Sequence, residues 1–335
     1  MYCEAEQAPA VVRHQLEANA ERLDRLGERL RQLAPRAVVT CARGSSDHAA
    51  TFAKYLIETR LNILTSSAAP SVSSVYDSTL NLAGTVFIAI SQSGASPDLL
   101  STVRAARNAG ALVVALVNAE SSPLAQTADF TIPLCAGIER SVAATKSYIA
   151  SLCAIIQLVG SWARDAELLE ALREAPALLE RAWSLDWGAA VTRLRVASDL
   201  YVIGRGLGLG VAQEAALKFK ETCGLHAEAV SSAEVRHGPM ALIRAGFPVL
   251  MFTQDDETRG GVESLATELA ARHADVMLAG SRVPHAIILP TTTSSPVLEP
   301  MLIVQTFYRM VNALALARGR NPDQPPYLNK VTETV

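Results

Sequence analysis

A polar loop with the composition of an anion-binding site follows a short apolar run in the first third of the chain. The loop reads Ser91-Gln92-Ser93-Gly94-Ala95-Ser96, and Pro97 after it suits the first turn of a helix. Ser96 is a good N-cap for that helix. Free backbone N–H groups and the helix dipole favour an anion there, and the hydroxyls and amide add uncharged donors. The composition predicts a phosphate site, although Ser-rich turns without a ligand are also common.

A second Ser-bearing loop is expected at the same edge of the same sheet. It reads Arg43-Gly44-Ser45-Ser46-Asp47 and follows an apolar run that begins near residue 37. Gly44 permits close backbone approach, and Ser46 or Asp47 is a suitable cap for the next helix. Arg43 either serves this site or pairs with a surface carboxylate. Two donor-rich loops after neighbouring strands strengthen the prediction of a phosphate ligand.

A set of acid–base residues is expected on one helix face in the second half of the chain. Glu214, Lys218 and Glu221 are spaced at i, i+4 and i+7, which places them on one face. Such sets are usually solvated salt-bridge ladders, but the alanine-rich surroundings leave little polar surface here. The preceding turn, GRGLGLG, only loosely resembles a dinucleotide fingerprint, because no clear ribose-binding acid follows in a strand-end context. We therefore favour acid–base chemistry without a nucleotide cofactor.

Two further titratable residues lie outside this helix. His237 precedes Gly238 and Pro239, so it lies in a constrained loop. An imidazole there can act as an acid or a base near neutral pH, although a single loop histidine is more often structural or exposed. Lys330 lies in the C-terminal tail, where a lysine is usually solvated. Neither residue indicates an active site by itself.

The elements that must position these residues repeat along the chain. Residues 36–59 and 199–224 each read as an apolar run, a turn with Arg and Gly, and a segment of helical period. In each half a strand, a helix and another strand follow, at residues 85–90, 97–109 and 111–117, and at residues 248–253, 261–272 and 274–278. This alternation indicates βαβ units. We predict an α/β protein with two similar three-layer lobes, each a parallel sheet between helices.

Five segments follow from this pattern. We expect an N-terminal helix at residues 1–29, a first lobe at 30–165, a helical connector at 166–189, a second lobe at 190–320 and a tail at 321–335. The tail contains three prolines, at positions 322, 325 and 326, and cannot be helical throughout. The apolar stretch at residues 148–163 is interrupted by Ser151, Gln157 and Ser161, so it predicts a buried helix and not a membrane span.

Composition argues against several classes of protein. Lys and Arg total 30 and Asp and Glu total 33, and this net charge of −3 does not favour nucleic acid or an anionic membrane surface. The five cysteines contain no CxxC pair, which argues against a disulfide framework or a zinc site. The first residues lack the apolar region of a signal peptide. We expect a cytoplasmic protein with no metal, no redox cofactor, and no nucleic-acid or membrane partner.

Five motifs together resemble the sugar isomerase (SIS) family. They are SQSGASPD, the SxxATKSY segment from Ser141, GRG…EAALKFKE, HAEAVSSAEVRHGPMALI and DQPPYLNKVT. The match extends from about residue 30 to residue 335, and the order and spacing of the motifs make it specific. Within the family, the chain is similar to SIS-type glucosamine-6-phosphate deaminases and to the isomerase half of glucosamine-6-phosphate synthase. The resemblance implies two tandem SIS domains, each with a five-stranded parallel sheet.

The resemblance also implies a role for each candidate residue. Glu221 matches the base that moves a proton between C1 and C2, with Glu214 and Lys218 as companions on the same helix. His237 matches the residue that opens the sugar ring, which comes from the neighbouring subunit of a homodimer. Lys330 matches the lysine that forms a Schiff base with the keto-sugar. The implied substrate and phosphate contacts are Ser45, Ser46, Ser91, Gln92, Ser93, Ser96, Val142 and Ala144.

The expected substrate is a hexosamine or hexose 6-phosphate. A carboxylate can move the C2 proton of open-chain glucosamine 6-phosphate to C1 through an enediol-type intermediate, and the resulting imine hydrolyses to fructose 6-phosphate and ammonia. The synthase carries an N-terminal glutaminase domain whose nucleophile is a cysteine directly after the initiator methionine. Here the chain begins Met1-Tyr2-Cys3, with about 30 residues before the first lobe. We therefore expect a deaminase and do not assign Cys3 as a nucleophile.

Three alternatives remain open. One is an aminotransferase/isomerase of the synthase type that takes ammonia directly or from a partner glutaminase. Another is the same chemistry on galactosamine 6-phosphate. The third is a sugar-phosphate sensor without activity, although the chain shows no helix-turn-helix extension and keeps Glu221, His237 and Lys330.

Overall fold

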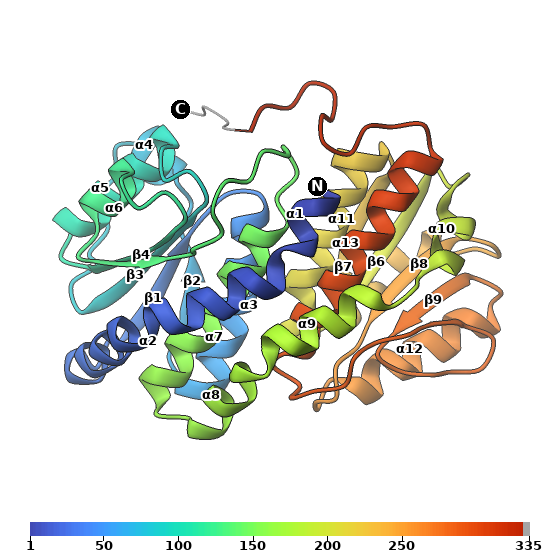
Figure 1. Ribbon diagram of the computed structural model, residues 1–335, viewed down its shortest axis with the longest axis horizontal. Coiled ribbons are helices and arrows are strands. Elements are labelled where there is room, and N and C mark those ends of the chain that lie inside the picture. Colours follow the sequence, from blue (N-terminus) through green and yellow to red (C-terminus); the bar gives the residue numbers. More distant parts are fainter. Residues whose placement is uncertain (331–335) are drawn as a thin grey trace. The chain divides into compact units, whose positions relative to one another are not determined.

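The computed structural model describes residues 1–330 and divides them into two compact lobes, which are described separately (Figure 1). Lobe 1 comprises Ala10–Glu139, Lys146–Arg173, Asn329 and Lys330. Lobe 2 comprises Met1–Pro9, Arg140–Thr145 and Glu174–Leu328. Each lobe therefore gathers segments from distant parts of the chain. The domain boundaries given above stay predictions.

Lobe 1 is built on a parallel sheet whose strands are short and apolar. The strands are β1 (Ala37–Cys41), β2 (Thr65–Ser67), β3 (Thr85–Ser91), β4 (Leu112–Val117) and β5 (Phe130–Pro133). Their order is β2-β1-β3-β4-β5, and all four pairings are parallel. Every residue of β3 is buried, as expected for a strand covered by helices on both faces.

The helices of lobe 1 cover this sheet. They are α2 (Ala8–Leu33), whose first two residues belong to lobe 2, α3 (Ser45–Leu61), α4 (Ser71–Ser74), α5 (Pro97–Asn108), α6 (Pro123–Thr127), α7 (Lys146–Ala163) and α8 (Ala166–Arg173). Helix α5 packs Leu99, Val103 and Ala106 against side chains of β1, β3 and β4. The prediction of a buried helix near residues 148–163 is confirmed, because α7 is buried from Lys146 to Trp162. Among residues 1–330, no helix combines the length and the apolar character that crossing a membrane requires.

Lobe 2 repeats the same strand order. Its strands are β6 (Asp199–Gly204), β7 (His226–Ser231), β8 (Pro248–Phe252), β9 (Asp275–Ala279) and β10 (Ile287–Leu289). The sheet order is β10-β9-β8-β6-β7, again with parallel pairings only. Read from the first strand of each lobe, both sheets follow the order 2-1-3-4-5. The predicted α/β fold with two similar lobes is confirmed.

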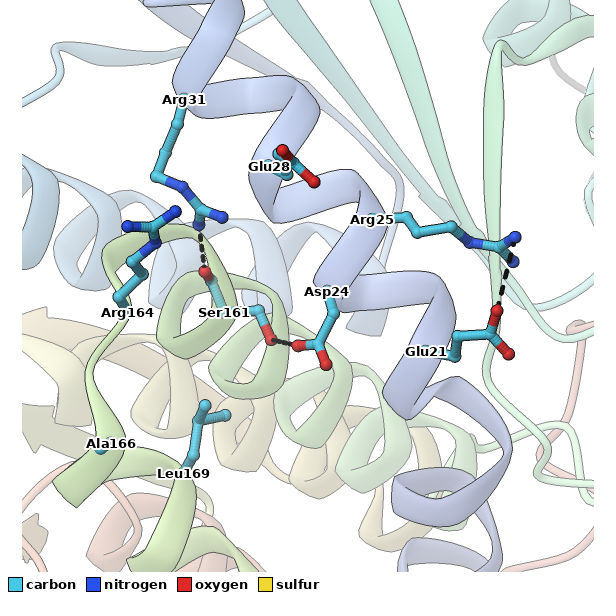
Figure 2. A pocket seen from close by; sticks show the side chains of 9 residues that line it. All are labelled: Glu21, Asp24, Arg25, Glu28, Arg31, Ser161, Arg164, Ala166 and Leu169. Carbon is cyan, nitrogen blue, oxygen red and sulfur yellow. Dashed lines mark hydrogen bonds and ion pairs between the residues drawn. The ribbon is translucent and has the colours of Figure 1, made fainter.

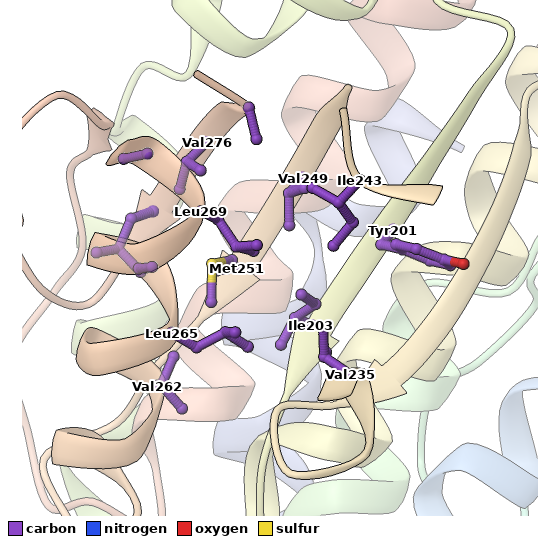
Figure 3. Close-up of a cluster of buried hydrophobic side chains, with 14 of the residues drawn as sticks. Tyr201, Ile203, Val235, Ile243, Val249, Met251, Val262, Leu265, Leu269 and Val276 are labelled. Carbon is purple, nitrogen blue, oxygen red and sulfur yellow. The ribbon is translucent and has the colours of Figure 1, made fainter. Parts of the chain in front are cut away.

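The helices of lobe 2 place an apolar core on the sheet. They are α1 (Tyr2–Glu6), α9 (Ala175–Ser184), α10 (Gly188–Leu194), α11 (Leu207–Cys223), α12 (Arg259–Ala271) and α13 (Glu299–Ala317), with short 3-10 turns at Glu234–His237 and Pro239–Leu242. Figure 3 shows Leu265 and Leu269 of α12 against Ile203 of β6 and Met251 of β8. Burial of one such side chain contributes about 1.5–3 kcal/mol. This packing fixes the ends of β6 and β8, from which two of the loops discussed below depart.

Candidate functional site

The two Ser-bearing loops of lobe 1 leave neighbouring strands at one edge of the sheet. Strands β1 and β3 pair in register, with Cys41 opposite Ala89. The strand order changes direction at this point, because β2 follows β1 in the chain but β3 lies on the other side of it. Ligands of open α/β sheets bind outside the carboxyl ends of the strands at such a switch point. The expectation that both loops share an edge is met.

The loop after β3 leaves hydrogen-bond donors unused. Gly94 N–H donates to Ser91 Oγ over 3.0 Å, and Ala95 N–H donates to Ser93 Oγ over 3.4 Å. Within residues 1–330 the backbone N–H groups of Ser93 and Ser96 have no hydrogen-bond partner, and Ser96 caps α5 without a side-chain bond. Free donors at a helix start favour an anion.

Gly94 sets the shape of this loop. Its φ of +62° lies in the left-handed region, and a Cβ at this position would overlap Ser122 Oγ. Only glycine fits this conformation and this close contact. The Gln92 amide and the Ser46 hydroxyl also have no hydrogen-bond partner in the described part of the chain. The two loops thus offer several uncharged donors near one another.

Arg43 joins the two loops. Its Nε and Nη2 donate to Oδ2 of Asp98 over 2.9 and 2.6 Å. Asp98 is the second residue of α5, and its side chain is only 1% exposed. The partner of Arg43 is therefore a buried carboxylate and not the surface carboxylate that we considered. This pairing was not predicted, because an acidic residue in the first turn of a helix is common and does not by itself indicate a partner.

The start of α3 differs from the prediction. Its N-cap is Gly44, with φ 55° and ψ −131°, and no side chain caps it. The expectation that Ser46 or Asp47 caps this helix is wrong, because the helix begins at Ser45, so Ser46 and Asp47 already lie inside its first turn. Burial raises the pKa of Asp47. The Ser46 hydroxyl is thereby left free for another partner.

Glu214, Lys218 and Glu221 meet on α11 of lobe 2, as their spacing predicted. Lys218 Nζ lies 2.5 Å from Glu221 Oε2 and 3.4 Å from Glu214 Oε1. The side chains of Glu214 and Lys218 are 0% exposed, whereas that of Glu221 is 16% exposed. Tyr308 of α13 donates its hydroxyl to Glu214 Oε1 over 3.0 Å. A solvated salt-bridge ladder is excluded by this burial.

The charges of this triad stabilise one another. Burial by itself lowers the pKa of Lys218, but the attraction of Glu214 and Glu221 and their hydrogen bonds outweigh it, so the net pKa is raised. Lys218 is therefore an ammonium at neutral pH. Glu221 is the member with solvent access, so it is the carboxylate that a substrate can reach.

His237, Val142 and Ala144 also belong to lobe 2. His237 ends the 3-10 turn Glu234–His237, is exposed, and has no hydrogen-bond partner in the described part of the chain. Val142 and Ala144 are half-buried. Their segment is held by Glu4, whose carboxylate accepts the N–H groups of Arg140 and Ser141. The roles of all three candidates stay predictions.

Lys330 is tethered to a buried carboxylate of lobe 1. Its Nζ lies 3.0 Å from Glu139 Oε2, and the side chain of Glu139 is 0% exposed. Ser147 donates to the same carboxylate through its N–H over 3.2 Å and its Oγ over 2.7 Å. Sequence reasoning missed Glu139, because 191 positions separate it from Lys330 and no spacing links them. Residues 331–335 of the predicted tail lie outside the described residues.

Lobe 1 also contains a charged cleft, which Figure 2 shows. No residue of the loops at 43–46 and 91–96 lines it. It has a volume of about 490 Å³ and is lined by α2, the end of α7 and the start of α8. Arg31 donates to the carbonyl groups of Ser161 and Trp162 over 2.6 and 3.1 Å, which satisfies the last turn of α7. Asp24 accepts from Ser161 Oγ over 3.3 Å. These contacts join two helices, and no predicted site residue lines the cleft.

Comparison with known protein families identifies the family to which this chain belongs. The model of the SIS domain matches residues 34–160 and 193–280, which include most of both sheets. The chain belongs to the SIS domain family. Its two lobes are tandem SIS domains, and the predicted family is confirmed.

Relatives of known name agree with this assignment. The isomerizing glutamine–fructose-6-phosphate aminotransferase of Aeropyrum pernix is 36% identical over 307 residues, which are 86% of this chain and 49% of that protein. The chain spans about half the length of the curated relatives it matches. A provisionally named phosphosugar isomerase from Silicibacter pomeroyi DSS-3 is 42% identical, with a TM-score of 0.93 over 96% of this chain and 99% of that one. The C-terminal domain of glucosamine-fructose-6-phosphate aminotransferase from Francisella tularensis is 25% identical, with a TM-score of 0.86 over 97% and 98%.

Proposed function

We propose that this SIS protein is an amino-sugar-phosphate isomerase/deaminase that converts glucosamine 6-phosphate to fructose 6-phosphate and ammonia. The observation that carries the proposal is the triad of α11, in which a partly exposed carboxylate, Glu221, is backed by the buried ammonium of Lys218. A proton shuttle between two adjacent sugar carbons needs one such base with solvent access and a fixed cation for the charge that develops.

The loops of lobe 1 bind the phosphate in this proposal. The free N–H groups of Ser93 and Ser96 and the free hydroxyl of Ser46 are donors for its oxygens. This contact holds the substrate by an atom group that does not react, so its binding energy serves to orient C1 and C2. Ser45, Ser91 and Gln92 complete the loops, and Val142 and Ala144 line the sugar.

The proton transfer is assigned to Glu221. It removes the C2 proton of the open-chain aldose and returns it to C1, and the C2 amine becomes an imine that water hydrolyses to the ketone and ammonia. Lys218 stabilises the developing negative charge, and Glu214 keeps Lys218 in place. His237 opens the sugar ring, and Lys330 condenses with the ketone of fructose 6-phosphate to form a Schiff base with loss of water.

A synthase-type reaction is the second candidate. The names of the Aeropyrum pernix and Francisella tularensis relatives favour it, since both are fructose-6-phosphate aminotransferases. In that case the protein forms glucosamine 6-phosphate from fructose 6-phosphate, with ammonia supplied directly or by a glutaminase. Deamination of galactosamine 6-phosphate would use the same residues.

The deciding experiment measures products in both directions. Purified protein with glucosamine 6-phosphate is expected to release fructose 6-phosphate and ammonia, and galactosamine 6-phosphate is run beside it. Fructose 6-phosphate is supplied with ammonia or with glutamine to test synthesis. Folded protein that releases no ammonia from either amino sugar would rule out deamination, and faster amino-sugar formation would select the synthase-type reaction.

Glu221→Gln tests the proposed base. It is expected to lower kcat by about 10²–10⁴-fold and to leave the Kd for fructose 6-phosphate nearly unchanged, because the phosphate contacts lie elsewhere. The matched control is Glu21→Gln, which removes a carboxylate paired with Arg25 over 3.6 Å on α2, a helix that carries no proposed site residue. Loss of binding together with turnover would point to a structural role for Glu221.

Lys330 is tested by reductive trapping. Borohydride added to wild-type protein with fructose 6-phosphate is expected to attach the hexitol phosphate covalently, with the added mass on the peptide that contains Lys330. Lys330→Ala is expected to remove that adduct. An adduct on another lysine would contradict the assignment.

We also propose that the active form is a homodimer in which His237 serves the neighbouring subunit. Glu221→Gln and His237→Ala are each expected to be nearly inactive. If the two residues of one site come from different subunits, a mixed dimer contains one complete site, so an equimolar mixture regains roughly a quarter of wild-type activity. A mixture that stays inactive after confirmed subunit exchange would place His237 in the site of its own subunit.

A further inference from the structure

Asp98 and Arg43 form an ion pair whose buried member, Asp98, is held in place by a backbone hydrogen bond. Asp98 Oδ1 accepts the N–H of Leu99 over 2.8 Å, while Oδ2 accepts both donors of Arg43. A buried carboxylate is costly unless it is paired and hydrogen-bonded. Here the first turn of α5 and the guanidinium supply both conditions. The position of Arg43 is therefore set by a fixed group.

The other edge of Arg43 remains available. A guanidinium has five N–H donors in one plane, and only those of Nε and Nη2 bond to Asp98. Its Nη1 has no hydrogen-bond partner within residues 1–330, and the side chain is 54% exposed. A guanidinium edge in this state matches a phosphate, with which it forms paired, charge-assisted hydrogen bonds.

The distribution of charge in the two loops also favours a contact between Arg43 and a phosphate. Arg43 is the only basic residue in the loops at 43–46 and 91–96. The remaining donors are hydroxyls, one side-chain amide and backbone N–H groups, and none carries a full positive charge. A sugar phosphate is a dianion near neutral pH, so the only cation of these loops is the natural partner for its charge.

We propose that Arg43 binds the substrate phosphate directly and that Asp98 is the positioning residue that aims it. This inference rests on the proposed function for the identity of the phosphate ester. The simpler alternative is that the pair only fastens the two loops. Lobe 2 shows that fastening does not need a guanidinium, because there Gln254 Nε2 donates to the backbone oxygen of Arg205 over 3.0 Å.

Two variants separate contact from fastening. Asp98→Asn keeps the cation and weakens its anchor. Arg43→Gln combined with Asp98→Asn removes both charges together, so no unpaired carboxylate is left buried. The matched control is Arg107→Gln at the other end of α5, which breaks a pair with Asp129 over 3.0 Å. Calorimetry gives the Kd for inorganic phosphate and for fructose 6-phosphate, and thermal unfolding checks the fold of each variant.

Direct contact predicts a large and specific loss. The double variant is expected to bind both ligands at least about tenfold more weakly, Asp98→Asn to bind them about threefold more weakly, and Arg107→Gln to be unchanged. A folded double variant within twofold of wild type would overturn the proposal. Equal losses in Asp98→Asn and the double variant would overturn it too, since they would mean that the pair only fastens the loops.

The design also separates this inference from the proposed function. Binding of inorganic phosphate and of fructose 6-phosphate is measured without turnover. Wild-type protein that binds both ligands but does not convert amino sugars would remove the proposed activity and leave the Arg43 comparison intact. Wild-type protein that binds neither ligand would overturn the phosphate site and Arg43 with it.

Discussion

Helix α3 of lobe 1 and helix α11 of lobe 2 occupy equivalent places in their lobes, but α3 buries apolar side chains where α11 buries charged ones. Each follows a glycine in nearly the same conformation, φ 55° and ψ −131° at Gly44, and φ 57° and ψ −129° at Gly206, and each has 17 residues. The eighth and twelfth residues are Phe52 and Leu56 in α3 but Glu214 and Lys218 in α11, and all four are 0% exposed. Apolar side chains therefore satisfy this position in the fold. The fold itself does not require an ion pair at this position, which supports the catalytic role proposed for the pair in α11.

The loops that follow the third strand of each lobe also differ, and here it is lobe 1 that carries the polar groups available to a ligand. In lobe 1 the loop after β3 leaves the N–H groups of Ser93 and Ser96 without a hydrogen-bond partner among residues 1–330. In lobe 2 the loop after β8 satisfies itself: Asp256 Oδ1 accepts Thr258 N–H over 2.8 Å, and Gln254 Nε2 donates to Asp256 Oδ2 over 2.9 Å. Asp255, Asp256 and Glu257 would also repel an anion. In the proposed function, one backbone frame thus serves anion binding in lobe 1 and acid–base chemistry in lobe 2.

The largest expected effect comes from breaking the buried ion pair. Lys218→Met leaves Glu214 buried without its cation and is expected to lower the free energy of unfolding at pH 8 by about 3–5 kcal/mol. Adding Glu214→Gln keeps an acceptor for the Tyr308 hydroxyl and removes the charge, so most of the lost stability is expected to return while turnover stays absent. Urea unfolding measures both.

The control for this experiment lies in the counterpart helix. Leu56→Met makes an apolar change at the twelfth position of α3 and is expected to cost less than about 1.5 kcal/mol. If the double variant of α11 stays as unstable as Lys218→Met, the ion pair is part of the scaffold. The contrast between the two helices would then not indicate function.

The two capping glycines give a matched pair of intermediate size. Gly44→Ala and Gly206→Ala each force a residue with a Cβ into a positive φ, at a cost of about 1–3 kcal/mol in the free energy of unfolding. We expect only Gly44→Ala to raise the Kd for inorganic phosphate, because only its loop belongs to the proposed phosphate site. Equal weakening of phosphate binding by both would show that the two edges do not differ as described. Urea unfolding and calorimetry provide the two measurements.

The starts of α5 and α12 supply a smaller contrast. Asp256→Ala removes the acceptor for Thr258 N–H and is expected to cost about 1 kcal/mol of stability without changing phosphate affinity. Ser96→Ala removes a hydroxyl that caps nothing, so it is expected to change stability by less than about 0.5 kcal/mol and to weaken phosphate binding. Denaturation midpoints and phosphate titrations of both variants check the pair. The comparison fails if Ser96→Ala is the more destabilising of the two.

Local pattern was sufficient to predict most of the fold. The apolar runs that become β3, β4, β8 and β9 lie between polar turns. In the helices between these strands, apolar residues recur with helical spacing. Strands β2 and β10 have three residues each, too few for a pattern of their own, and only pairing with a neighbour defines them. The cap of α3 was missed because Gly44 starts the helix through its conformation and not through a side chain.

The contacts of the candidate residues were harder to predict from the sequence than the candidate residues themselves. The face shared by Glu214, Lys218 and Glu221 follows from helical spacing alone. Glu139 beside Lys330, and Asp98 beside Arg43, are contacts of tertiary structure between segments with no common period. The burial of the triad likewise depends on the helices packed around α11. Local sequence therefore indicated which side chains are chemically capable, and packing determined what each of them contacts.

The smallest expected effect concerns the residue four positions before the first residue of α3 and of α11. It is Cys41 in β1 and Ile203 in β6, and both are at most 1% exposed. Burial raises the pKa of the Cys41 thiol from 9.0 to about 12. Between these values the folded state holds its proton and the unfolded state does not. The stability that Cys41 contributes is therefore complete below pH 9 and is lost as the pH rises toward 12.

Cys41→Val makes lobe 1 resemble lobe 2 at this position and removes the titration. At pH 7 the variant is expected to stay within about 1 kcal/mol of wild type, since both side chains fill the site with similar volume. Between pH 8 and pH 10 the wild-type protein is expected to lose about 1 kcal/mol more than the variant. Urea unfolding of both proteins at the two pH values isolates this difference, because all other titrating groups are shared. Identical pH dependence would mean that the thiol ionises in the folded state as readily as in the unfolded one, and that this position is not as dry in lobe 1 as its counterpart in lobe 2.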